Sequence, residues 1–180
     1  MTRYFQPLII LVFVSSMLGC SSSPTYTTSE EVRLATTSTV DAFENVTWLE
    51  APPVTSPQTL VTYQLRSASA KDLSFYQLYL HQTREKEQGW ALFEHARGKD
   101  GEPLSFLKID RQHLSDPPGG LKEVFAVQLT DQDVSRYAQT GLSLVLRGQH
   151  DLVAVEVPAF YFQGFLNRSH EPSTSSPKKP

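Results

Sequence analysis

LSFYQLYLH, residues 73–81, is the stretch that most clearly indicates the fold of this chain. In an extended strand, successive side chains point to opposite faces. This stretch therefore presents two sets of side chains, Tyr76, Leu78 and Leu80 on one face and Phe75, Gln77, Tyr79 and His81 on the other. A period-two pattern rich in β-prone residues predicts a strand.

The same period recurs on both sides of this stretch. Strands are predicted at 32–36, 46–51, 60–65, 90–95, 104–109, 124–129, 142–146 and 152–157. The charged run 84–89 is expected to connect residues 73–81 and 90–95 as a hairpin, and Pro52-Pro53, Asp100-Gly101 and the segment 116–120 are breaks or turns. About eight or nine short strands predict a mainly β fold, a single antiparallel β-sandwich that is immunoglobulin-like or similar.

The period changes in two places, which predicts one or two short helices. Thr130 is suited to cap a helix over 131–139, because acidic residues follow it and Gly141 stands where such a helix would end. Near the C-terminus, Pro158 suits the start of a second helix through Leu166. An irregular edge strand is the alternative for that segment, since it contains both Pro158 and Gly164.

The first twenty residues, MTRYFQPLIILVFVSSMLGC, have a different character. Arg3 supplies a positive charge, and an unbroken apolar run follows from Leu8 to Val14. This order of features is typical of a secretory signal peptide. A membrane-spanning helix needs about 20 apolar residues, and this run is much shorter.

The end of this segment resembles the lipobox of bacterial lipoproteins, in which a small residue and then Gly or Ala precede a Cys. Gly19-Cys20 matches that pattern, and Cys20 is the single cysteine of the chain. The resemblance, which covers residues 1–21, implies cleavage between Gly19 and Cys20 and acylation of Cys20. Ser21 resembles the outer-membrane sorting pattern. We therefore expect a protein held by its N-terminal lipid on the periplasmic face of the outer membrane, with the inner membrane as the alternative.

Composition divides the chain into four segments. Residues 1–19 form the predicted signal peptide. Residues 20–30 are expected to form a flexible tether, which consists of the lipidated Cys20 and a Ser/Thr-rich stretch. Residues 31–168 are expected to form the β-sandwich domain, and residues 169–180 a disordered tail. The formal net charge of −3 argues against nucleic acid as a partner, because phosphate backbones require clustered Lys and Arg.

Residues that could carry chemistry are few and scattered. His81 and His95 would face each other across the predicted hairpin, but two histidines without a third ligand predict no metal site. Asp110, His113 and Asp116 form an acid–histidine cluster without a nucleophile motif. We therefore predict no enzymatic activity, no cofactor and no metal.

The aromatic segment near the C-terminus supplies the one candidate binding site. Phe160, Tyr161 and Phe165 are predicted as a patch for an envelope protein, because aromatic residues are enriched at interfaces. The alternative is that they fill the core. The predicted function is a membrane-anchored, non-catalytic binding or accessory module in the periplasm. The alternatives are a hydrolase of cell-wall or surface glycan, and a structural protein that pairs through a sheet edge.

Overall fold

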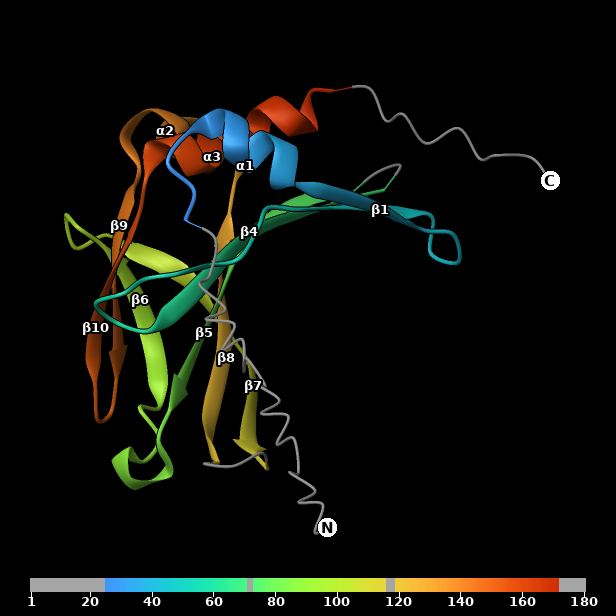
Figure 1. Ribbon diagram of the computed structural model, residues 1–180. Coiled ribbons are helices and arrows are strands. Elements are labelled where there is room, and N and C mark those ends of the chain that lie inside the picture. Colours follow the sequence, from blue (N-terminus) through green and yellow to red (C-terminus); the bar gives the residue numbers. More distant parts are fainter. Residues whose placement is uncertain (1–24, 71–72, 116–118, 172–180) are drawn as a thin grey trace, which may run out of the picture.

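The structure is a computed structural model that describes residues 25–70, 73–115 and 119–171 (Figure 1). The predicted signal peptide, Cys20 and residues 172–180 of the predicted tail lie outside the described residues, as does Asp116. Within the described part of the chain, no helix is long and apolar enough to cross a membrane.

Antiparallel strands make up most of the described structure, which confirms the mainly β prediction. The strands are β1 (Thr37–Asp41), β2 (Val46–Glu50), β3 (Val54–Thr55), β4 (Val61–Ala70), β5 (Leu73–Arg84), β6 (Phe93–Gly98), β7 (Pro103–Leu114), β8 (Gly120–Leu129), β9 (Leu142–Gly148) and β10 (Leu152–Val157). The helices are α1 (Ser29–Ala35), α2 (Asp131–Thr140), α3 (Ala159–Ser169) and a 3-10 turn, η1 (Lys86–Gln88).

The predicted sandwich is not confirmed. Hydrogen bonds connect the strands in one continuous path, β1-β2-β4-β5-β8-β7-β6-β9-β10, with β3 paired to β4. This single sheet curls into a half-barrel, and the three α-helices lie together across one end of it (Figure 1). Alternation along each strand requires only that one face be buried. A curled sheet satisfies that pattern as well as two packed sheets do.

β5 lies in the interior of this path, between β4 and β8, and its side chains alternate between the two faces as predicted. Leu78 and Leu80 are fully buried on the concave face, which holds the core. Tyr79 and His81 lie on the convex face, where they are half-buried. The best-defined strand in the sequence is thus a central strand of the fold.

The concave face is closed by apolar side chains from the helices. Tyr161, Phe162 and Phe165 of α3 are fully buried, and Val134 of α2 and Val32 of α1 join the same core. The predictions of helices at 131–139 and after Pro158 are confirmed. The edge-strand alternative for the C-terminal segment is wrong.

The strand predicted at 32–36 is wrong, because these residues belong to α1 or to its C-terminal cap. The helix is initiated by a capping box in which Thr28 accepts from the backbone N–H of Glu31 and the Glu31 side chain accepts from that of Thr28. α1 is a third α-helix, where one or two were predicted. It also includes the last two residues of the predicted tether.

The predicted hairpin between residues 73–81 and 90–95 is also wrong. Both edges of β5 are taken by β4 and β8, and β6 pairs with β7 and β9 instead. The segment between β5 and β6 is held by the buried carboxylate of Glu123 in β8. This carboxylate accepts hydrogen bonds from the backbone N–H groups of Leu92 (2.9 Å) and Phe93 (3.3 Å). Leu92 has a left-handed backbone conformation (φ 57°), which helps to turn the chain away from β5.

Candidate functional site

The aromatic patch predicted near the C-terminus does not lie on the surface. Tyr161 and Phe165 are fully buried, and Phe160 is partly buried and packs against the core. Tyr161 and Phe165 are four residues apart in α3, so they share a face of the helix. That face is turned to the sheet, and these residues fill the core, which is the alternative that the sequence left open.

Aromatic side chains gather instead on the convex face of the sheet, over β2, β4 and β5. The strand register aligns Trp48 with Phe75 across Ala68. Arg66 and Tyr79 lie on the neighbouring cross-strand rows of the same face. We call Trp48, Arg66, Phe75 and Tyr79 the Arg66 face. All four side chains are half-buried.

The guanidinium group of Arg66 lies over two aromatic rings. Its central carbon is 4.4 Å from the ring centroid of Tyr79 and 5.8 Å from that of Trp48. Nε and Nη2 both donate to Oε1 of Gln77, at 3.2 and 2.9 Å. The rings of Trp48 and Phe75 meet edge to face at 5.8 Å. Stacking and the fork of hydrogen bonds hold the guanidinium in one orientation.

No carboxylate forms an ion pair with Arg66 within the part of the chain that the structure describes. Glu50 stands opposite Arg66 in the register but does not reach ion-pair distance. The charge of Arg66 thus lies in an aromatic setting, with no ion-pair partner in the described part of the chain. Trp, Tyr and Arg are the residues most enriched at the energetic centres of protein interfaces.

His81 lies on the same convex face, and burial together with the nearby charge of Lys122 lowers its pKa. We expect the free energy of unfolding to decrease as the pH falls through 6.5, the ordinary pKa of histidine. The unfolded chain then binds a proton that folded His81 resists, and the slope for one proton is at most about 1.4 kcal/mol per pH unit. Urea unfolding at pH values between about 8 and 5 measures this dependence.

The matched variant for this prediction is His81→Gln, which cannot titrate. The wild-type protein should lose stability relative to His81→Gln as the pH falls through this window. Arg168 and Arg33 lower the pKa of Glu171, so this carboxylate stays ionised throughout the window. Parallel pH profiles of the two proteins would contradict the prediction.

A cavity of about 340 Å³ lies on the other, concave face of β2 and β4. Its floor is formed by strands β1, β2 and β4, with the hydroxyl groups of Ser38, Thr47, Ser67 and Ser69 beside Leu49. Tyr76 of β5 and residues 168–171, at and just after the C-terminal end of α3, complete the lining. We call this space the hydroxyl cavity. Because strand side chains alternate, Ser67 and Ser69 face the cavity while Arg66 faces outward.

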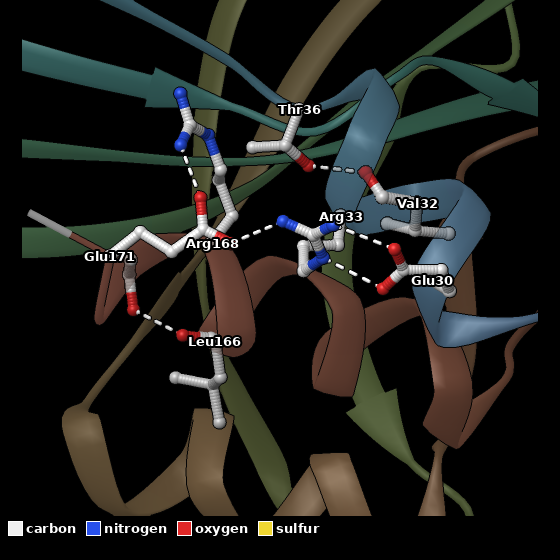
Figure 2. A network of polar contacts seen from close by, with 8 residues as sticks. Glu30, Val32, Arg33, Thr36, Leu166, Arg168 and Glu171 are labelled. Carbon is white, nitrogen blue, oxygen red and sulfur yellow. Dashed lines mark hydrogen bonds and ion pairs between the residues drawn. The ribbon is translucent and has the colours of Figure 1, made fainter. Parts of the chain in front are cut away.

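A chain of ion pairs connects α1 to the end of α3 beside this cavity (Figure 2). The carboxylate of Glu171 bridges Arg168 and Arg33, and Arg33 also pairs with Glu30 at 2.6 Å. The hydrogen bonds from both arginines lower the pKa of Glu171. Two cations and two anions balance in this chain of ion pairs. The cavity lining itself contains Arg168 and Glu171, which pair with each other, beside His170.

The acid–histidine cluster predicted around His113 is not assembled. Asp110 pairs with Val124 and His113 with Leu121, so the two side chains lie on opposite faces of β7. Asp110 accepts hydrogen bonds from Arg111 and Gln112 of its own strand. His113 meets the ring of Trp90 edge to face at 5.2 Å. Asp116 lies outside the described residues.

The remaining histidines do not converge either. His81 and His95 lie on strands that are not neighbours in the sheet. Among residues 25–70, 73–115 and 119–171, no group of three or more His, Cys, Asp or Glu side chains could hold a metal ion.

The sheet edge required by the third hypothesis is present along β7. From Ser105 onward, β7 pairs with β8 alone among the described strands. The register shifts between Lys108 and Asp110, which marks a bulge. Bulges and edge lysines discourage strand addition. This edge is thus long, but the bulge and Lys108 protect it from pairing with another strand.

Comparisons of the chain with protein-family models, curated proteins and solved structures found no match. The alternation of residues 73–81 already places Phe75 and Tyr79 of the Arg66 face on the same side of one strand. The sequence does not indicate that Trp48 and Arg66 join them, because only the strand register brings these two residues beside β5.

Proposed function

We propose that this chain is a lipid-anchored bacterial envelope lipoprotein whose β domain is a non-catalytic binding module in the periplasm. The anchor is the acylated Cys20, and the partner is another envelope protein held at the Arg66 face. The single observation that carries the binding role is the guanidinium of Arg66, which stacks on Trp48 and Tyr79 and has no ion-pair partner among the described residues.

The support for the anchor comes from the first 21 residues. A charged start, a short apolar run and Gly19-Cys20 together resemble a lipoprotein signal. Several acyl chains hold a protein on a bilayer, since each buried CH₂ contributes about 0.8 kcal/mol. Ser21 follows the cysteine, which favours sorting to the outer membrane.

Binding at the Arg66 face is supported by its preorganisation. A free arginine loses rotamer entropy when it binds, whereas Arg66 is already held by Gln77 and by two rings. Confinement to a membrane raises the effective concentration of such a module near partners on the same surface. The anchor and the face therefore act together.

The test uses the full chain, tagged at its C-terminus and isolated from membranes of its native host. Mass spectrometry is expected to show an N-terminal, acylated Cys20. Cross-linking before extraction is expected to recover a specific envelope protein whose yield falls at least about tenfold in Arg66→Glu and Trp48→Ser, the loss typical of a hot-spot residue.

The control variant is Leu152→Ser, which removes an apolar side chain that is 65% exposed on β10, at the other end of the sheet. It should leave the yield unchanged, and all variants should keep the unfolding transition of the wild-type protein. An unmodified Cys20 would refute the anchor. A yield that is insensitive to both Arg66-face variants would refute the binding role.

A further inference from the structure

Four hydroxyl groups converge on the hydroxyl cavity from three adjacent strands. Ser38 of β1, Thr47 of β2, and Ser67 and Ser69 of β4 lie in two neighbouring cross-strand rows, since Leu49 aligns with Ser38 and Ser67, and Thr47 with Ser69. None of the four hydroxyls makes a hydrogen bond to another described residue. The sheet thus presents a set of donors and acceptors that no described residue uses.

The chemistry of this lining selects a class of ligand. A Ser or Thr hydroxyl both donates and accepts, so an array of them complements a molecule whose own groups do the same. Leu49 and Tyr76 add an apolar surface to the same lining. A sugar ring combines hydroxyls at its edge with C–H groups on its face, and it matches both parts of the cavity.

Charge argues against the competing ligand classes. Arg168 is the single Lys or Arg side chain among the described residues that line the cavity, and its charge is matched by its ion pair with Glu171, beside His170. A phosphate or a nucleotide would need an excess of cations, and a metal ion would need converging carboxylates. The volume of about 340 Å³ lies in the range of small-molecule sites.

We infer that the hydroxyl cavity is a binding site for a neutral saccharide unit. The cavity lies on the face of β2 and β4 opposite to the Arg66 face, so the inference does not depend on the proposed protein partner. The ligand is recognised by its hydroxyls and its ring face, and both a free sugar and a terminal unit of an envelope glycan present these groups.

The test is a titration of the full chain in detergent micelles, followed by backbone amide NMR shifts. The probes are the disaccharides chitobiose and maltose, with inorganic phosphate as the anionic comparator. We expect saturable shifts from at least one disaccharide at concentrations up to about 50 mM, centred on residues 38, 47, 67 and 69. Chitobiose represents acetylated wall-type sugar, and maltose represents unmodified glucose, so the preferred probe identifies the kind of sugar unit that the cavity accepts.

The variants Thr47→Val and Ser69→Ala remove hydroxyls without adding bulk, and Thr47→Val keeps the β-branched shape that suits a strand. Each is expected to weaken saccharide binding at least about fivefold, the effect of losing one or two hydrogen bonds. The control is Ser105→Ala, which removes an exposed hydroxyl of β7 outside the cavity. It should leave the affinity unchanged.

Three results would overturn the inference. The first is the absence of saturable shifts with either disaccharide, and the second is a response to phosphate alone, which would indicate an anion site. The third is saccharide binding that Thr47→Val and Ser69→Ala leave intact. Cross-linking to the partner at the Arg66 face should be normal in these variants, so failure of one proposal is distinguishable from failure of the other.

Discussion

Replacing Tyr161 with Phe is expected to lower the free energy of unfolding by about 2–4 kcal/mol, although the change removes a single oxygen. The hydroxyl of Tyr161 donates to the carbonyl oxygen of Pro52 at 2.7 Å and accepts from the backbone N–H of Leu65 at 3.2 Å. The side chain is fully buried, and burial raises the pKa of its hydroxyl. Without this group, two buried backbone groups would lose their partner.

The Tyr161 hydroxyl makes these two hydrogen bonds because the sheet has a gap at this point. β2 ends at Glu50 and β3 begins at Val54, with Pro52 and Pro53 between them. Proline has no N–H to offer a neighbouring strand, so the ladder along β4 is interrupted there. The Tyr161 hydroxyl fills the gap from α3 and ties the helix to the sheet.

The matched control is Tyr63→Phe. Tyr63 is also buried and its ring lies 5.2 Å from that of Tyr161, but its hydroxyl makes no hydrogen bond to another described residue. Chemical unfolding should therefore show a much smaller change for Tyr63→Phe than for Tyr161→Phe. Equal losses in the two variants would show that the hydrogen bonds of Tyr161 contribute nothing specific.

Gly164→Ala is expected to destabilise the fold by about 2–3 kcal/mol, against the usual effect of this substitution in a helix. Alanine favours a helix interior over glycine by about 1 kcal/mol. At position 164, however, an added Cβ would lie 2.4 Å from the carbonyl oxygen of Ser29 and 2.7 Å from Cβ of Val32. α1 would have to move away from α3, which exposes the fully buried Val32.

Asn167→Ala in the same helix is the control, because Asn167 is exposed. It should change stability by only a few tenths of a kcal/mol. A double-mutant cycle of Gly164→Ala with Val32→Ala should show coupling, since the two sites are in contact. A neutral or stabilising Gly164→Ala would mean that α1 does not pack as closely on α3 as the structure shows.

The elements found from sequence are those whose signals are local. The helix at α2 was predictable because Thr130 and Asp133 form its capping box within four residues. β5 was predictable because its alternation is uninterrupted. α1 was missed although Thr28 and Glu31 carry the same capping signature, since the apolar residues Val32 and Leu34 suggested a strand.

The candidate sites were less predictable, because they combine distant segments. The Arg66 face joins residues of β2, β4 and β5, and the hydroxyl cavity adds β1 and the end of α3. The sequence pointed to Tyr161 and Phe165 for their aromatic character. It could not show that helical spacing and the gap beside Pro52 direct these side chains into the core.

By itself, the sequence determined the mainly β character, most strand positions, two of the helices and the lipoprotein-like start. Each of these depends on residues a few positions apart, so spacing alone reports it. The tertiary structure decided that one sheet curls into a half-barrel instead of splitting into two, that β6 leaves β5, and which aromatic rings stay at the surface. These outcomes depend on strand register and on contacts between residues about 100 positions apart, such as Tyr161 with Pro52, which no local pattern encodes.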